Sequence, residues 1–130
     1  MSGPIIMVED NELDASLAKA CFEQAGVDSE FLCFESGMAF LEHLQGVRQG
    51  SVEMPSVILL DLNMPGMNGF AVLSHLKSSD DFQKEPQVTI VSHSDDPRDA
   101  ARCLAMGADR YFTKPANAAS YIEFFSGLVH

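Results

Sequence analysis

Basic residues are scarce in this sequence: eight lysines and arginines stand against nineteen aspartates and glutamates, and the formal net charge is −11. A field of this sign repels nucleic acids and anionic membrane surfaces. Long apolar runs are also missing, since no stretch approaches the roughly 18 apolar residues that span a bilayer. We therefore expect no nucleic-acid partner and no membrane association. The acidic surface would instead attract a basic protein patch or a bound cation.

Cysteine is equally sparse. Cys21, Cys33 and Cys103 are odd in number and far apart in the sequence, which argues against a disulfide framework and against a clustered zinc site. The start of the chain, Met1–Pro4, has neither the basic segment nor the cleavage site of a secretory signal. These features predict a cytoplasmic protein whose thiols are reduced and packed as small apolar side chains.

Apolar runs alternate with helical patterns along the 130 residues, a length that suits one domain. The strands are predicted at Pro4–Val8, Ser29–Phe34, Val57–Leu60, Val88–Val91 and Arg110–Thr113. The helices are predicted at Leu13–Ala25, after an N-cap at Ser36, at Phe70–Ser78, from a start at Asp95–Pro97 to Met106, and at Asn117–Leu128. A loop is predicted over Gln45–Ser56. Strict alternation predicts an α/β fold: a five-stranded parallel sheet in the flavodoxin-like order 2-1-3-4-5, with helices on both faces.

Polar residues follow four of the predicted strands: Glu9 and Asp10, then Asp61, then Ser92, then Lys114. Ligands bind at the carboxyl ends of parallel strands, so these side chains are expected to meet at one mouth. Three carboxylates and one ammonium leave a net charge of −2, and two like charges about 4 Å apart repel by roughly 4 kcal/mol at an effective dielectric of about 20. A divalent cation with oxygen ligands, most naturally Mg²⁺, would relieve this repulsion.

Each of these residues also has an ordinary structural explanation. Asp10 could cap the following helix, and Asp61 could form a turn. Lys114 precedes a proline and could be solvated, and Ser92 alone is unremarkable. That all of them lie at the same end of one predicted sheet favours a functional site.

Four segments resemble the receiver domain of two-component response regulators: Ile6–Asp10, Leu59–Gly69, Val91–Ser92 and Tyr111–Pro115. Each segment alone is a weak signal, but all four occur in order, at predicted strand ends, and the resemblance covers nearly the whole chain. The loops after the third and fourth strands most resemble the single-domain branch that includes cyanobacterial phytochrome response regulators. The resemblance implies a phosphorelay protein that takes a phosphoryl group from phosphohistidine and changes its protein contacts.

The resemblance also implies roles for the acidic residues. Asp61 would accept the phosphoryl group, with Asp10 and Asp61 as Mg²⁺ ligands. Glu9 would act mainly through a bound water, and the backbone carbonyl of Asn63 would be a further ligand. A carboxylate that is already ionised needs no general base to act as the nucleophile.

On the opposite side of the mouth, the resemblance implies that Lys114 pairs with a phosphoryl oxygen and that Ser92 hydrogen-bonds to the same group. Tyr111 would be the aromatic residue that moves inward with Ser92, although plain core packing explains it too. His93 departs from the small residue usual in the family. It could narrow access to Asp61, contact the phosphoryl group, or have no role.

The resemblance further implies a signalling domain and not an enzyme, apart from its own phosphotransfer and dephosphorylation. We expect a single receiver domain over residues 1–130, without an output domain. The phosphoryl donor would be a sensor histidine kinase or a histidine phosphotransfer protein that docks near the first helix. Output would be a contact with a downstream protein. A homodimer through the face of the fourth helix, fifth strand and fifth helix is also expected, aided by Phe124 and Phe125.

Several other classes fit less well. An aspartyl phosphatase usually has a second aspartate where this chain has Asn63. An EF-hand would need oxygen ligands where Pro65 and Val72 stand. A flavodoxin would need a phosphate-binding loop in place of the acidic run Glu9–Glu12. A protein-binding module that keeps the receiver fold without phosphorylation remains open.

Overall fold

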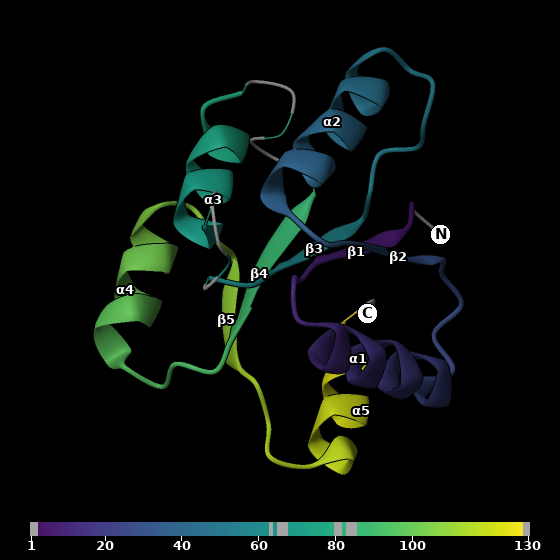
Figure 1. Ribbon diagram of the computed structural model, residues 1–130, viewed down its shortest axis with the longest axis vertical. Helices are drawn as coiled ribbons and strands as arrows, with labels where there is room; N and C mark the ends of the chain where they lie inside the picture. The colour runs from purple at the N-terminus through teal and green to yellow at the C-terminus, as the bar shows by residue number, and fades with distance from the viewer. Residues whose placement is uncertain (1–2, 63, 65–67, 80–81, 83–85, 129–130) are drawn as a thin grey trace.

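A computed structural model describes residues 3–62, 64, 68–79, 82 and 86–128. The strands are β1 (Ile5–Val8), β2 (Phe31–Phe34), β3 (Val57–Leu60), β4 (Gln87–Ser92) and β5 (Arg110–Thr113). The helices are α1 (Glu12–Ala25), α2 (Gly37–Arg48), α3 (Gly69–Lys77), α4 (Pro97–Ala105) and α5 (Ala118–Ser126). The strands form one parallel sheet in the order β2-β1-β3-β4-β5 (Figure 1), which confirms the predicted fold class.

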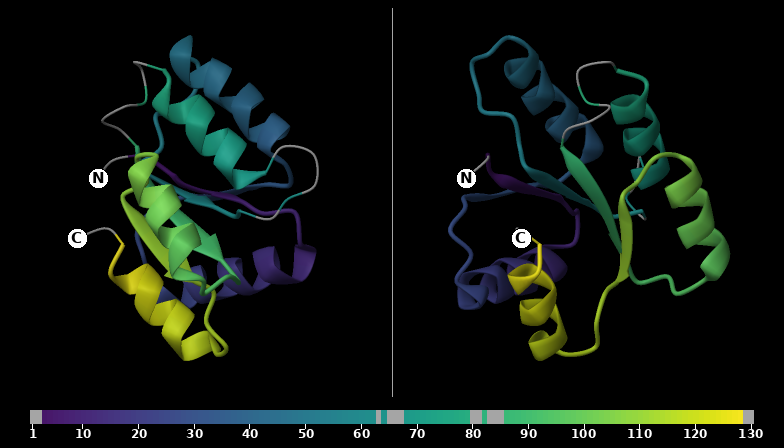
Figure 2. Two further views of the ribbon diagram at one scale, coloured as in Figure 1. Left: turned by 90° about the vertical axis from the view of Figure 1, so that its left-hand side faces the viewer. Right: turned by 180° about the vertical axis from the view of Figure 1, so that it is seen from behind.

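The sheet has a hydrophobic layer on each face because successive side chains of a strand point in opposite directions. Ile6 and Val8 of β1 pack with α2, α3 and α4, whereas Ile5 and Met7 pack with α1 and α5. The two layers of helices are seen on opposite sides of the sheet in Figures 1 and 2. β1 and β3 are buried along their whole length, so the residues that follow them are fixed firmly at the end of the sheet.

The fifth helix contributes its aromatic side chains to the core. Phe125 is fully buried and Phe124 is 7% exposed. Phe125 packs edge-on against Phe22 of α1, with ring centroids 5.6 Å apart. The expectation that Phe124 and Phe125 would aid a dimer contact is therefore wrong, because both rings are used inside the domain to join α5 to α1 and the sheet.

Each helix begins with a polar side chain that accepts a hydrogen bond from the first turn. These N-caps are Asn11, Ser36, Asn68, Asp96 and Asn117. Such a cap contributes about 1 kcal/mol to stability. The cap of α1 is Asn11, whose side chain accepts from the backbone N–H of Asp14 at 3.0 Å. The alternative in which Asp10 caps this helix is therefore wrong.

The second helix is longer than the sequence predicts. It continues through Gln45 and Gly46 to Arg48, where a loop was expected from Gln45. One glycine does not end the helix because Val47, in the last turn of α2, packs against the core that α2 and α3 share. The Arg48 guanidinium also lies 5.3 Å from the centre of the Phe82 ring. Among the described residues, no helix combines the length and apolar character needed to cross a membrane.

Candidate functional site

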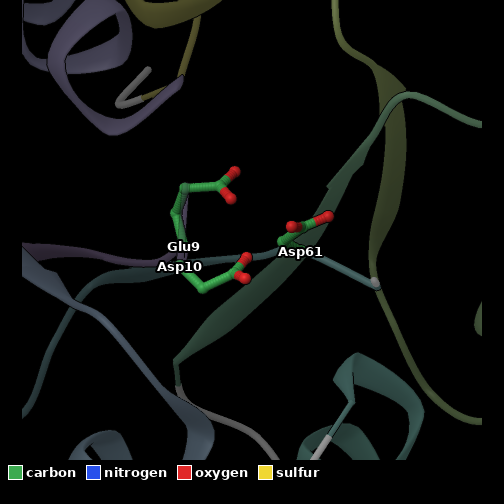
Figure 3. A group of neighbouring side chains, drawn as sticks. All are labelled: Glu9, Asp10 and Asp61. Atoms are coloured by element: carbon green, nitrogen blue, oxygen red, sulfur yellow. The ribbon is translucent and has the colours of Figure 1, made fainter. Parts of the chain in front are cut away.

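Three carboxylates meet where β1 and β3 end. Val8 and Leu60 are paired in register, so the residues that follow them, Glu9 and Asp61, are neighbours. The backbone N–H of Asp61 donates to the carbonyl of Val8 at 3.2 Å and continues the strand pairing. Carboxylate oxygens of Glu9, Asp10 and Asp61 all lie within 4.8 Å of one another. Figure 3 shows the three side chains directed into a common space beyond the strand ends.

The three carboxylates differ in burial. Glu9 is 2% exposed and Asp61 is 5% exposed, whereas Asp10 faces solvent. Burial raises the pKa of Glu9 to about 7, a rise that the charge of Asp61 reinforces and a hydrogen bond from Lys114 opposes. Oxygen ligands of this kind suit hard divalent cations. This set of described residues therefore fits a divalent metal ion by its chemistry and spacing.

Lys114 reaches this cluster from the end of β5. Its Nζ lies 2.5 Å from Glu9 Oε1, 3.0 Å from Asp14 Oδ2 and 3.9 Å from Asp61 Oδ2, and its side chain is only 5% exposed. Burial disfavours the ammonium charge, but the hydrogen bonds to Glu9 and Asp14 outweigh it and raise the pKa of Lys114. The ammonium therefore stays charged, and among these oxygens it lies nearest to Glu9.

The end of β4 is joined to β5 by hydrogen bonds that involve side chains. Ser92 is fully buried, and its Oγ accepts from the backbone N–H of Ser94 at 3.1 Å. The Tyr111 hydroxyl donates to the backbone carbonyl of Ser94 at 2.8 Å, and Thr113 Oγ1 donates to the same carbonyl at 3.4 Å. Ser92 and Tyr111, both predicted from the sequence, therefore contact the same short loop.

Asp14 and His93 also line the cavity around these carboxylates. His93 was singled out from the sequence, whereas Asp14 was not. His93 Nε2 lies 3.0 Å from Asp14 Oδ2, the oxygen that also receives Lys114. Asp14 was missed, although it lies in the first turn of α1, directly after the acidic end of β1. The hydrogen bonds from Lys114 and His93 outweigh partial burial and lower the pKa of Asp14.

The structure thus brings together most of the residues predicted for the site. A cavity of about 200 Å³ is lined by Glu9, Asp10, Asn11, Asp14, Asp61, His93 and Lys114. Ser92 and Tyr111 do not line this cavity, and both are hydrogen-bonded to Ser94. Asn63, whose backbone carbonyl was expected as a metal ligand, lies outside the described residues.

The parallel sheet in the order β2-β1-β3-β4-β5 and the acidic cluster at its carboxyl edge suit a receiver domain, and the comparison with known families agrees. Residues 5–125 match the response regulator receiver domain family, so the chain belongs to that family. It is a signalling domain of two-component systems.

Among known proteins, the chain is similar to the response regulator Rcp1 of Synechocystis sp., with 30% identity over 95% of this chain and 84% of Rcp1. Two solved structures are also similar. The Mn²⁺-bound form of Rcp1 has 27% identity and a TM-score of 0.81, covering 97% of this chain and 91% of that one. The phosphorylated cyanobacterial phytochrome response regulator RcpA has 28% identity and a TM-score of 0.84, covering 98% and 91%. These relatives confirm the resemblance to the phytochrome response regulator branch.

Proposed function

We propose that this domain accepts a phosphoryl group on Asp61 from a phosphohistidine donor and signals by changing its protein contacts. The observation that carries the proposal is the environment of Asp61. This carboxylate is 5% exposed, belongs to a three-carboxylate cluster and has the Lys114 ammonium 3.9 Å away. The similarity to a structure of phosphorylated RcpA supports the same function.

The carboxylate cluster is the proposed Mg²⁺ site, with Asp10 and Asp61 as ligands and Glu9 acting through a bound water. The backbone carbonyl of Asn63 is the further ligand in this proposal. The oxygen atoms of the carboxylate cluster suit Mg²⁺. The Mn²⁺-bound form of the relative Rcp1 supports a divalent cation at this site. When bound, Mg²⁺ would offset negative charge on the phosphoryl oxygens.

The protein residues contribute positioning and charge. A carboxylate oxygen of Asp61 forms a bond to phosphorus while the phosphorus–nitrogen bond of the donor breaks, and the leaving imidazole takes a proton from solvent. Lys114 stabilises the charge that develops on the phosphoryl oxygens. The new anion then attracts Ser92, whose Oγ at present accepts from the N–H of Ser94.

The readout follows from the contacts of that loop. Movement of Ser92 towards the phosphoryl group would shift Ser94, whose carbonyl holds the Tyr111 hydroxyl. Tyr111 would then repack and alter the surface formed by α4, β5 and α5.

We propose this surface of α4, β5 and α5 as the contact for a downstream protein and for a homodimer. In the homodimer, exposed Leu104 replaces Phe124 and Phe125 as the apolar contact. Sedimentation equilibrium that finds only monomers, with and without phosphorylation, would remove the homodimer.

We propose a sensor histidine kinase or a histidine phosphotransfer protein as donor, docking on α1. Leu13 and Leu17 support this, because they are 81% and 42% exposed and lie one turn apart on the helix that carries Asp14. Leu13→Gln should slow transfer from the kinase and leave phosphorylation by acetyl phosphate unchanged. Equal rates with both donors would contradict docking at this patch. Because relatives are named for phytochromes, a phytochrome-type kinase is the first donor to test.

We also propose that the chain works as a single receiver domain in the cytoplasm. Cys21, Cys33 and Cys103 are all free thiols, which supports a reducing compartment. In this proposal its only reactions are its own phosphorylation and dephosphorylation.

The deciding experiment is incubation with Mg²⁺ and acetyl phosphate, followed by intact mass measurement. We expect the mass of one phosphoryl group to be gained, and the gain to be lost in Asp61→Asn. Asp28→Asn is the matched control, because it removes an exposed carboxylate elsewhere. If neither acetyl phosphate nor a kinase gives a gain, a binding module that does not use phosphorylation replaces this proposal.

A further inference from the structure

Asp14 holds two groups on the far side of the mouth with a single oxygen atom. Its Oδ2 lies 3.0 Å from Lys114 Nζ and 3.0 Å from His93 Nε2. An ionised carboxylate can only accept hydrogen bonds, so the Nε2 of His93 must carry the proton that it donates. Asp14 belongs to the first turn of α1, whereas His93 follows β4 and Lys114 follows β5. The bridge therefore connects a helix on one face of the sheet with the ends of two strands.

The bridge lies on the outer side of the cavity. The side chain of His93 is 69% exposed and that of Asp14 is 25% exposed, whereas that of Asp61 is only 6% exposed. All three residues line the same cavity of about 200 Å³. The bridged pair therefore forms part of the solvent-facing rim of the cavity that contains Asp61.

The Oδ2 atom of Asp14 also competes with the Asp61 carboxylate for the ammonium of Lys114. Lys114 Nζ is 3.0 Å from Asp14 and 3.9 Å from Asp61. Hydrogen bonds to charged groups are the stronger ones in proteins, so Asp14 and, at 2.5 Å, Glu9 hold the ammonium more closely than the acceptor carboxylate does.

We propose that Asp14 is a positioning residue whose bridge to His93 and Lys114 slows both the phosphorylation of Asp61 by small donors and the loss of the phosphoryl group to water. This inference rests on the proposed function and adds a determinant of its rates. In phosphorylation, a bond forms from an Asp61 oxygen to phosphorus and the phosphorus–oxygen bond to acetate breaks, releasing acetate. In hydrolysis, a water oxygen bonds to phosphorus, the bond to Asp61 breaks, and a proton of that water leaves with inorganic phosphate or passes to solvent.

The test measures both rates in Asp14→Ala with Mg²⁺ and acetyl phosphate. We expect each rate to rise about three- to tenfold, the size expected for losing charge-assisted hydrogen bonds of a partly exposed group. Glu12→Ala is the matched control, since it removes an exposed carboxylate from the same helical turn, and its rates should equal those of the wild type. Thermal unfolding of each variant separates these changes in rate from loss of folded protein.

A double-mutant cycle with His93→Ala tests whether the two residues act together. If His93 narrows the mouth through its bond to Asp14, the His93→Ala change should have little further effect once Asp14 is alanine. Fully additive effects would mean that His93 acts by bulk alone and would overturn the bridge.

The remaining outcomes are also decisive. Unchanged or slower rates in Asp14→Ala, or equal increases in Glu12→Ala, overturn the inference while the proposed function stands. A wild-type protein that gains no phosphoryl group from acetyl phosphate or from a kinase removes the proposed function, and the inference with it.

Discussion

The two walls of the mouth are held in different ways. The acidic wall, formed by Glu9, Asp10 and Asp61, is fixed by the backbone: the N–H of Glu9 donates to Phe34 and that of Asp61 to Val8. The opposite wall, formed by Ser92, His93 and Lys114, also has a backbone bond, from the N–H of Lys114 to Ser92. In addition, its side chains are held by hydrogen bonds to Asp14, Glu9 and the Ser94 loop. Rotation of a side chain can change the second wall, whereas a change in the first would disturb the strand pairing.

This difference suits a switch. The groups that receive a phosphoryl group should stay in place, because catalysis by positioning is sensitive to small displacements. The groups that report it should have two arrangements of similar energy. We therefore expect substitutions in the acidic wall to change the chemistry of phosphorylation and the stability of the fold. Substitutions in the opposite wall should change the rate of phosphorylation and the signalling that follows it.

The largest effect should come from Lys114→Met, which removes the cation of the opposite wall. The rate of phosphorylation by acetyl phosphate should fall about 10²- to 10³-fold, as when one preorganised charge-stabilising donor is lost. The control is Lys19→Met, the same chemical change at an exposed position of α1. A Lys114→Met rate within about tenfold of the wild type, equivalent to about 1.4 kcal/mol, would show that the acidic wall alone carries the reaction.

The acidic wall should be stabilised by its cation. Mg²⁺ at about 100 times its dissociation constant should raise the free energy of unfolding by about 2.7 kcal/mol, if only the folded state binds it. Asp10→Asn should lose most of this gain, and Glu12→Gln should keep it. The measurement is urea unfolding with and without Mg²⁺ at constant ionic strength. A full gain in Asp10→Asn would exclude Asp10 as a ligand.

A smaller effect is expected where the backbone of the acidic wall is packed most tightly. A Cβ at Gly69 would lie 2.3 Å from the carbonyl oxygen of Asp61 and 2.7 Å from the Cα of Leu62. Gly69→Ala should therefore destabilise the protein by about 1–3 kcal/mol, as overpacking does. At Gly127 the nearest atoms would be 3.8 Å away, so Gly127→Ala should change stability by less than about 0.5 kcal/mol. Chemical unfolding measures the free energy of unfolding of both variants. Equal values would mean that the backbone of Asp61 and Leu62 can shift to make room for the added methyl group.

The difference between the walls also explains what the sequence could predict. The strands were found because Val57–Leu60 and similar apolar runs suit strands buried on both faces. Glu9, Asp61 and Lys114 were found because they directly follow such strands. The order of strands along the sequence therefore locates the acidic wall and also Lys114 of the opposite wall.

What the sequence could not predict depends on side-chain direction and tertiary packing. Asp14 looked like an ordinary acidic residue of a first helical turn, a common place for aspartate, and only the fold shows that it meets His93 and Lys114. The length of α2 depends on Val47 reaching the core and Arg48 reaching Phe82. The cap at Asn11 displaced the alternative at Asp10 because the helix starts one residue later than that alternative required.

The smallest effect should come from Tyr111→Phe, which alters the loop next to the opposite wall. This change removes the hydrogen bond from the hydroxyl to the carbonyl of Ser94, so the free energy of unfolding should fall by about 0.5–1.5 kcal/mol. Tyr121→Phe is a matched control, because the Tyr121 hydroxyl is buried and has no hydrogen-bond partner among the described residues. Removal of the Tyr121 hydroxyl should leave the free energy of unfolding unchanged or raise it. Thermal and urea unfolding of the two variants side by side measures the difference. If Tyr111→Phe is as stable as the wild type, the Ser94 loop is not held by this hydroxyl, and Tyr111 acts by its ring alone.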